Sequence, residues 1–311
     1  GSETASTVSS RGVYKFPVED KKSTKYEDHQ CSSYDVEACS WSNIPDEDFA
    51  LADDNHWTIG QFVWTGFDYL GEPSPYDTDA WPNHSSMFGI IDLASLPKDR
   101  YYLYRSVWNK DAETLHILPH WTWPGREGEV TPVFVYTNYP TAELFINGKS
   151  YGKQSKNDSS LKNRYRLMWM DAVYEPGEVK VIAYNKDGKA VAEKVVRTAG
   201  KPHHIELVSN RNELTADGKD LAYVTVKVVD KDGNLCPTDN RQINFSAKGT
   251  GKYRAAANGD PTNLEQFHLP KMHTFNGMLT AIIQAGETAG EIVFTAKANG
   301  VKAGNIRIQT K

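Results

Sequence analysis

An early apolar stretch of the chain is short and ends in turn residues. Residues 62–64 are apolar or aromatic without a break, and residues 71–75 supply one glycine and two prolines. A short apolar run closed by turn residues is typical of a strand that is buried on both faces. We therefore expect a buried strand whose C-terminal end delivers Trp64, Asp68 and Tyr69 into a loop, as in parallel (β/α) barrels.

Two helices are expected around this strand. Pro45 opens a segment that extends to about Asp54, and acidic residues at positions 46–48 lie near the positive end of the helix dipole. Residues 97–108 begin with proline and are predicted to form the helix that closes the barrel layer. Four of its side chains fall at helical spacing: Tyr101, Tyr104, Arg105 and Trp108.

Beyond residue 110 the pattern changes to short alternating strands separated by turn dipeptides. Asn-Gly at 147–148 and Asp-Gly at 187–188 are strong signals for two-residue hairpins. Short strands with regular turns over residues 112–199 predict an immunoglobulin-like β-sandwich. The expected strands are Val133–Thr137, Glu143–Ile146, Tyr165–Met170, Val179–Tyr184 and Val191–Val196.

The same pattern returns after a linker at residues 198–202 and predicts a second immunoglobulin-like sandwich over residues 200–311. Asp-Gly at 217–218 and 232–233 and Asn-Gly at 299–300 mark hairpins. The expected strands are Ile205–Val208, Ala222–Val229, Gln242–Ala247, Leu279–Ile283, Glu291–Ala298 and Asn305–Gln309.

Composition and charge narrow the class of protein. A chain of 311 residues is long enough for two or three domains, and 24% charged with 39% hydrophobic residues is within the range of soluble globular proteins. The net charge of −5, without a cluster of Lys or Arg, argues against a nucleic-acid partner. We expect no membrane partner either, because no apolar run approaches the roughly 20 residues of a membrane-spanning helix.

The cysteines and the first residues leave two questions open. Cys31 and Cys39 either pair within one loop or, like Cys236, stay as free thiols, and their spacing does not indicate a metal site. No metal and no cofactor are expected. The chain begins at Gly1 without a methionine or signal peptide, so we expect a fragment or a processed piece.

The tryptophans are confined to the first part of the chain. All eight precede residue 170, and a flat aromatic ring suits the apolar face of a sugar. Core roles are expected for most of them. A sugar-binding site, if the chain has one, is therefore expected before residue 170.

Several motifs together resemble glycoside hydrolase family 2, the β-galactosidase family, over essentially the whole chain. They are residues 2–6 with 9–12, 62–73, 89–92, 97–108, 137–138 with 143–149, and 258–261. The resemblance implies a mainly β protein with two immunoglobulin-like β-sandwich domains. These follow the C-terminal strands and helices of a truncated (β/α)8 TIM barrel. The implied domains are residues 1–111 for the barrel remnant, 112–199 for the first sandwich and 200–311 for the second.

The resemblance also implies chemistry at the first residues. Retaining glycosidases use two carboxyl groups about 5–5.5 Å apart, a nucleophile and an acid/base. Glu3, which the resemblance places at the end of the seventh barrel strand, is the implied nucleophile; the alternative is a terminal glutamate without a role. The family's acid/base is a Glu following an Asn upstream of the nucleophile. The Asn-Glu pair at 212–213 lies far downstream and is interpreted as a solvated turn.

Four further residues are candidates for binding substrate. Trp64 is the implied sugar platform, with a core position as its alternative. Asp68 either bonds a sugar hydroxyl, orients a neighbour or caps the following loop. Tyr34 and Asp35, in the loop after the nucleophile segment, are expected to line the pocket.

These assignments imply the C-terminal fragment of an exo-acting, retaining β-galactosidase-like hydrolase that is inactive alone. The alternative is a non-catalytic tandem β-sandwich that binds carbohydrate or protein. Expected partners are a β-galactoside or a related oligosaccharide or polysaccharide, together with the missing N-terminal part of the barrel or a second copy. The resemblance also implies a protein exported by a bacterium, periplasmic or extracellular.

Overall fold

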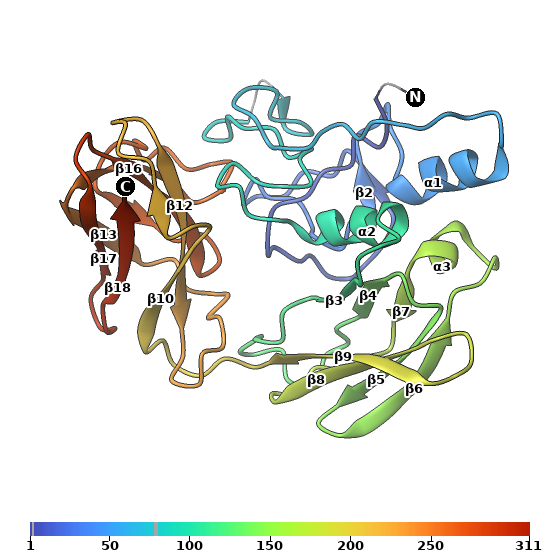
Figure 1. Ribbon diagram of the computed structural model, residues 1–311. Helices are drawn as coiled ribbons and strands as arrows, with labels where there is room; N and C mark the ends of the chain where they lie inside the picture. Colours follow the sequence, from blue (N-terminus) through green and yellow to red (C-terminus); the bar gives the residue numbers. More distant parts are fainter. Residues whose placement is uncertain (2, 78–79) are drawn as a thin grey trace. The chain divides into compact units, whose positions relative to one another are not determined.

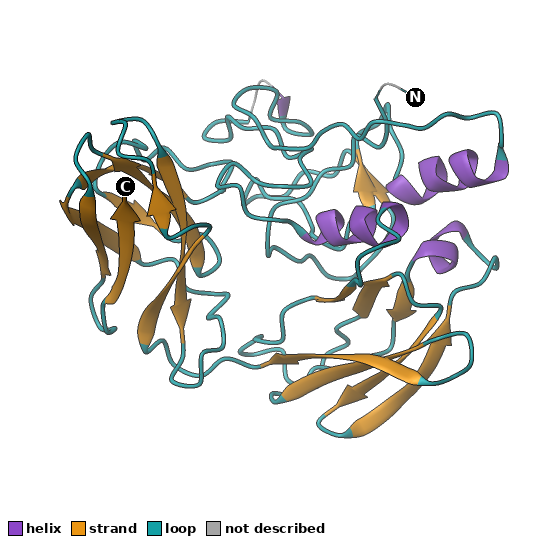
Figure 2. Cartoon of the chain, in the orientation of Figure 1, coloured by secondary structure: helices purple, strands orange, loops and turns teal. Residues whose placement is uncertain are grey.

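The computed structural model covers residues 1–311 and describes all of them except Ser2, Thr78 and Asp79. It is mainly β, with 37% of residues in strands and 8% in helices, which confirms the expected fold class. Strands dominate both sandwich regions, whereas the few helices are short (Figure 2).

The chain forms two compact units (Figure 1). Unit 1 contains Gly1–Asp92 and Pro97–Thr198, and unit 2 contains Ala199–Lys311 with the short segment Leu93–Leu96. The change of unit at residue 199 falls within the linker expected from the sequence. The further division of unit 1 at residue 111 stays a prediction.

Unit 1 contains a β-sandwich of two antiparallel sheets with the orders β3-β4-β7 and β6-β5-β8-β9. Buried and partly exposed positions alternate along β5 and β8, so each strand turns one face into the core. Leu144, Val181 and Trp169 from the two sheets belong to the same buried cluster. The strands are β3 Leu115–Leu118, β4 Val133–Thr137, β5 Thr141–Ile146, β6 Lys149–Ser155, β7 Leu167–Trp169, β8 Glu178–Tyr184 and β9 Ala190–Arg197.

Unit 2 is a second sandwich, with sheet orders β10-β12-β16-β14 and β11-β18-β17-β13-β15. Val226 and Leu279 from one sheet and Phe294 from the other share one core. The strands are β10 His204–Ser209, β11 Glu213–Leu214, β12 Leu221–Val229, β13 Gln242–Gly249, β14 Gly251–Ala257, β15 Lys271–His273, β16 Met278–Ala285, β17 Gly290–Lys297 and β18 Gly304–Thr310.

The N-terminal region of unit 1 combines loops with α1 (Pro45–Asp54), α2 (Asp99–Trp108) and a two-stranded parallel sheet of β1 (Lys21–Lys22) and β2 (Glu37–Ala38). The two longer helices lie close to the positions expected from their prolines. Helix α2 contacts β3 and β4 of the sandwich. Its Leu103 lies in one buried cluster with residues of α1 and β4, so the N-terminal region and the first sandwich share a core.

Two expectations about unit 1 were wrong in detail. The strand expected at residues 165–170 is divided: a short helix α3 (Leu161–Tyr165) precedes β7, and the Ser160 side chain caps this helix by accepting from the backbone N–H of Asn163. The run at residues 62–64 is not buried on both faces. It pairs through isolated bridges, and Phe62 is 75% exposed, because the described residues do not cover its outer face.

Two further properties concern side chains along the described chain. Cys31, Cys39 and Cys236 are buried free thiols. Within the described residues, the helices are too short or too polar to cross a bilayer.

Candidate active site

The segment after Glu3 runs parallel to the segment that contains Trp64. Thr4 and Val63 form a parallel bridge. The Thr4 N–H donates to Phe62 O at 3.0 Å, and the Trp64 N–H donates to Thr4 O at 2.9 Å. The backbones that carry the candidate nucleophile and the candidate sugar platform are therefore direct neighbours, as expected for consecutive barrel strands.

A third segment lies on the other side of the Trp64 segment. Phe67 and Ile91 form a second parallel bridge, and the Thr65 N–H donates to Phe88 O at 3.3 Å. The peptide bond between Trp64 and Thr65 is cis. The three segments thus lie in the order 4, 63–67 and 88–91, with the candidate platform in the middle.

Glu3 and Trp64 differ in their exposure to solvent. Glu3 is exposed, and Trp64 is partly buried. The Trp64 ring meets Tyr69 edge to face at 6.1 Å, and the Tyr69 hydroxyl donates to the carboxylate of Glu72. Burial, aided by the Glu72 carboxylate, raises the pKa of Tyr69 to about 12, so this phenol stays protonated at neutral pH.

Asp68 is buried, and both of its carboxylate oxygens have partners inside the protein. Lys98 Nζ lies 2.7 Å from Oδ2, and the backbone N–H of Gly89 donates to Oδ1 at 2.8 Å. Burial raises the pKa of Asp68 to about 6 in spite of the lysine. These contacts hold the loop that follows the Trp64 segment against residue 89, and the expected bond from Asp68 to a sugar hydroxyl stays a prediction.

The close approach at Gly89 explains why this position is a glycine. A Cβ atom there would lie 2.2 Å from the backbone N of Asp68 and 2.5 Å from Ile91 O. Because both atoms belong to the backbone, a side chain could not be accommodated without separating the two segments.

Tyr34 and Asp35, which were expected to line the pocket, lie in the core of unit 1 instead. Tyr34 is fully buried, and its hydroxyl donates to Pro132 O at 2.6 Å. The Asp35 carboxylate is also fully buried and lies between Arg100 at 3.5 Å and Arg166 at 3.9 Å. Burial raises the pKa of Asp35 although both guanidinium groups oppose the shift.

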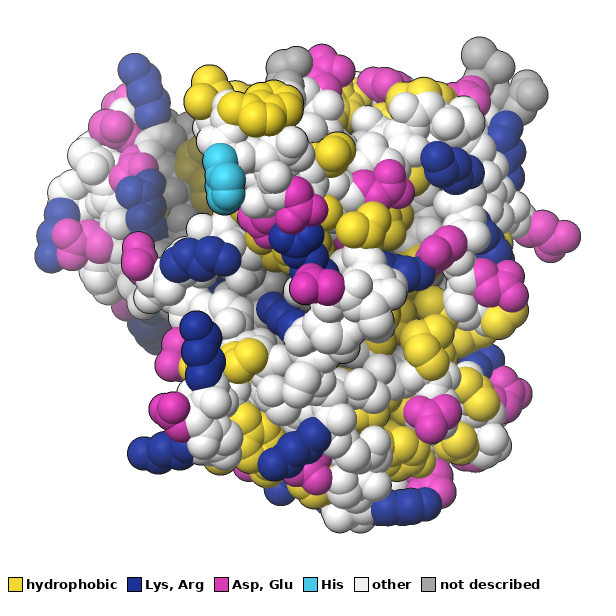
Figure 3. Space-filling view, turned by 90° about the vertical axis from the view of Figure 1, so that its right-hand side faces the viewer, with side chains coloured by type: hydrophobic (Ala, Val, Ile, Leu, Met, Phe, Trp, Pro, Cys, Tyr) yellow, Lys and Arg dark blue, Asp and Glu magenta, His cyan; other side chains and the backbone are white. Residues whose placement is uncertain are grey.

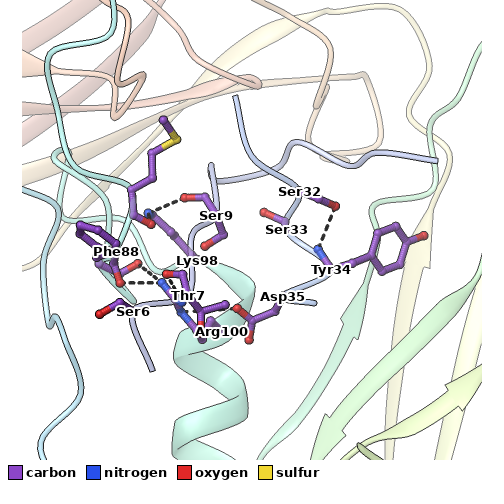
Figure 4. A network of polar contacts seen from close by, with 12 residues as sticks. Ser6, Thr7, Ser9, Ser32, Ser33, Tyr34, Asp35, Phe88, Lys98 and Arg100 are labelled. Carbon is purple, nitrogen blue, oxygen red and sulfur yellow. Dashed lines mark hydrogen bonds and ion pairs between the residues drawn. The ribbon is translucent and has the colours of Figure 1, made fainter. Parts of the chain in front are cut away.

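Two buried cations near the start of α2 were missed at the sequence level. Lys98 and Arg100 bond the backbone carbonyls of the segments around residues 7–9 and 87–89 (Figure 4). A signal was available for Arg100. It precedes Leu103 and Tyr104 by three and four positions, which places a cation on the buried face of the helix.

Glu213 and two histidines lie outside the three segments. Glu213, of the Asn-Glu pair interpreted as a solvated turn, is exposed as expected but begins the short strand β11 in unit 2, because it pairs with β18, and it forms an ion pair with Lys311. His56 is exposed and His84 is half-buried. The described residues contain no group of His, Cys, Asp and Glu that could hold a metal ion.

Large apolar side chains are exposed around the three segments. Phe62, Phe67 and Leu70 are each more than half exposed. Trp57 and Trp81 are exposed as well. In the space-filling view, hydrophobic side chains lie at the surface between interspersed acidic and basic ones (Figure 3).

Comparison with known proteins identifies the family. Residues 205–307 match glycoside hydrolase family 2 C-terminal domain 5, and residues 128–192 match a domain of unknown function, DUF4982. The β-galactosidase BoGH2A of Bacteroides ovatus is 42% identical over 99% of this chain. The chain belongs to glycoside hydrolase family 2, which confirms the resemblance noted in the sequence.

Solved structures agree with this assignment. A β-glycosidase from Bacteroides vulgatus superposes with a TM-score of 0.87 at 29% identity, covering 99% of this chain and 41% of that one. A glycosyl hydrolase family 2 member from Bacteroides cellulosilyticus gives a TM-score of 0.76 at 31% identity, covering 83% of this chain and 37% of that one.

The chain spans only part of its curated relatives. It covers 36% of the Bacteroides ovatus β-galactosidase and 35% of a 28% identical β-galactosidase from Thermoanaerobacter pseudethanolicus. A β-glucuronidase from Formosa agariphila is 23% identical over 86% of this chain, which covers 27% of that enzyme.

Proposed function

We propose that this chain is the C-terminal part of an exo-acting, retaining β-galactosidase-like glycoside hydrolase, with Glu3 as its nucleophile. The observation that carries the proposal is the parallel bridge between Thr4 and Val63, which makes the backbones of Glu3 and Trp64 neighbours. The 42% identity to a β-galactosidase over nearly the whole chain supports the choice of substrate class.

In the proposed reaction a Glu3 carboxylate oxygen attacks the anomeric carbon of a terminal β-galactoside. The bond from this carbon to the leaving oxygen breaks, and an acid from outside this chain protonates that oxygen. The resulting glycosyl-enzyme is then attacked by water, which gives its proton to the same acid/base and releases Glu3. Trp64 offers its ring to the apolar face of the sugar.

We expect the isolated chain to be inactive. A (β/α) barrel closes only with all of its strands, and the described residues supply a few neighbouring segments whose edges and apolar side chains are open. Phe62 and Phe67, 75% and 54% exposed, are the side chains that the rest of the barrel would cover. That partner is the N-terminal part of the same polypeptide or a second copy.

The first test is turnover of aryl β-galactosides by the isolated chain and by the full-length enzyme. We expect turnover only from the full-length enzyme. Equal turnover by the isolated chain would refute the inactive-fragment proposal. Parallel assays with an aryl β-glucuronide distinguish the two sugars named for its relatives.

The second test replaces the proposed nucleophile in the full-length enzyme. Glu3→Gln keeps the size of the side chain and removes the charge, so we expect kcat to fall at least about 10³-fold, as in other enzymes that lose a covalent nucleophile. Glu213→Gln is the matched control, because Glu213 is an exposed carboxylate in unit 2 paired with Lys311. Near wild-type kcat in the Glu3 variant would overturn the proposal.

A non-catalytic carbohydrate- or protein-binding module is the second candidate. It is favoured by the exposure of Trp57 and Trp81, whose rings are available to a ligand in the isolated chain. Saturable binding of a galactoside-containing polysaccharide to the isolated chain, lost in a Trp81→Ala variant, would support this function. We also propose that the protein is exported, periplasmic or extracellular, which cell fractionation tests.

A further inference from the structure

We propose that Arg100 is a positioning residue for the hydrolase. It holds the segment after Glu3 against residues 88–89, which lie beside the Trp64 segment. This inference rests on the proposed role of Glu3. It adds a residue that touches no substrate but helps the backbone pairing at Thr4 to hold the nucleophile in position.

The contacts of Arg100 join the two segments directly. Its Nη1 donates to the carbonyl of Thr7, four residues after Glu3. Its Nη2 donates to Phe88 O at 2.5 Å and to Gly89 O at 3.2 Å. One planar guanidinium therefore bonds both the segment that follows the candidate nucleophile and the segment at residues 88–89, in addition to the direct backbone bond from the Ser9 N–H to Met87 O at 3.0 Å.

The carbonyl of Phe88 extends this connection to the candidate platform. It accepts from Arg100 and also from the backbone N–H of Thr65, the residue after Trp64. Arg100 thus bonds the carbonyl of Thr7, which is near the candidate nucleophile. It also bonds the carbonyl of Phe88, which accepts from the residue after Trp64. A shift of the guanidinium would change the distance between the two functional side chains.

Lys98 provides a second connection of the same kind, two residues earlier. Its Nζ donates to Ser9 O at 2.6 Å and to Met87 O at 3.2 Å, and it also forms the ion pair with Asp68. Figure 4 shows both cations between the two backbone segments. Because they leave the same end of α2, the helix sets the spacing of both contacts.

The surroundings of Arg100 exclude a direct role in binding substrate. The residue is fully buried, and its Nε faces the fully buried carboxylate of Asp35 at 3.5 Å. Asp35 in turn faces Arg166 of the first sandwich at 3.9 Å. Arg100 acts through the backbone, and the buried carboxylate fixes the orientation of its side chain.

The expected effect follows from the geometry. Without the guanidinium, three carbonyls lose a buried donor. Backbone hydrogen bonds, at Thr4 and between the Ser9 N–H and Met87 O, then still hold the Glu3 segment in place. We expect its position relative to Trp64 to be less precise, because the three carbonyl contacts are lost. A misplacement of about 1 Å in an active site can lower the rate about 10²-fold. We expect Arg100→Gln to lower kcat by about that factor with KM changed less than about threefold. Arg100→Lys, which keeps one charged donor, should lower kcat about tenfold.

The experiment uses the full-length enzyme and compares Arg100→Gln and Arg100→Lys with Arg105→Gln. Arg105 lies on the same helix, is half-exposed and reaches only Glu113 O at 3.5 Å among the described residues, so its variant is a matched control. Kinetics are measured at least 15 °C below each melting temperature, where all variants are folded. Hydrogen exchange of the peptide containing residues 3–9 reports the positioning directly, and we expect faster exchange in both Arg100 variants.

The outcomes separate this inference from the proposed function. Wild-type kcat in folded Arg100→Gln overturns the positioning role even if its melting temperature falls, because that result describes a purely structural residue. If Arg100→Gln does not fold, Arg100→Lys decides, and kcat within twofold of wild type overturns the inference. An active Glu3→Gln enzyme removes the proposed function itself, whereas an inactive Glu3→Gln with fully active Arg100 variants removes only this inference.

Discussion

Arg166 joins the first sandwich to helix α1, and its removal should destabilise unit 1 strongly. The side chain is fully buried. Its Nε donates to Asp46 Oδ1 at 2.8 Å, its Nη2 donates to the other Asp46 oxygen, and its Nη1 donates to Tyr34 O and Tyr136 Oη at 3.2 Å each. Such a bidentate pair is among the strong polar interactions in proteins.

The magnitude can be worked from these contacts for Arg166→Met. Breaking a buried ion pair by removing one partner costs about 3–5 kcal/mol, because the other charge stays buried and unpaired. Asp46 lies in the first turn of α1, where the helix dipole offsets about 0.3–1 kcal/mol of that cost. We therefore expect the free energy of unfolding of unit 1 to fall by about 3–4 kcal/mol.

The tryptophans give an assay that reports unit 1 alone. All eight lie between residues 41 and 169, inside unit 1, and unit 2 contains none. Urea unfolding followed by tryptophan fluorescence thus monitors the unit that contains the ion pair. With a slope of about 2 kcal/mol per molar, the expected loss lowers the urea midpoint by about 1.5–2 M.

A double variant tests the cause. Arg166→Met with Asp46→Leu leaves no unpaired charge, so its cost should be at least about 2 kcal/mol less than the sum of the two single variants. A midpoint shift below about 0.3 M for Arg166→Met, or strict additivity of the two changes, would refute the reasoning.

Two further predictions use the same assay. Gly89→Ala places a methyl group against the backbone of Asp68 and should cost about 2–3 kcal/mol, whereas Gly66→Ala, with open space around it, should change stability by less than about 0.5 kcal/mol. Burial lowers the pKa of His120 to about 3, and the unfolded ring binds its proton near pH 6.5. Stability is therefore lost as the pH falls, by about 2 kcal/mol between pH 7.5 and 5. His120→Gln should remove that loss and His56→Gln should keep it; an unchanged pH dependence in His120→Gln would contradict the assignment.

Helices and turns whose boundaries are determined by residues adjacent in the sequence could be predicted from the sequence. Helix α1 lies at Pro45–Asp54 as expected, because the proline and the acidic first turn determine its start. The Asn-Gly turn at 147–148 joins β5 to β6 as a two-residue loop, as expected. The Asp-Gly dipeptide at 187–188 also lies in a hairpin, between β8 and β9, but its connection spans residues 185–189, so the expected two-residue loop was wrong. Strand β6 (Lys149–Ser155) was missed because it is polar along almost its whole length and shows no alternation.

Positions that depend on distant segments could not be predicted in this way. The run at 62–64 has the composition of a buried strand, but burial requires neighbours that the described residues do not supply. Tyr34 and Asp35 follow the nucleophile segment closely in sequence, yet the shared core with the first sandwich draws them inward. Asp35 is buried between two arginines that are 65 and 131 positions away (100 − 35 and 166 − 35), so no local pattern reveals them.

Labelling of the full-length enzyme with a 2-deoxy-2-fluoro-galactosyl fluoride tests the central claim most directly. The fluorine slows hydrolysis of the glycosyl-enzyme, so the nucleophile stays covalently marked and can be located by peptide mass spectrometry. We predict that the label lies on Glu3, in the peptide that neighbours the Trp64 segment. A label on any other carboxylate, or equal labelling of the Glu3→Gln enzyme, would contradict the assignment.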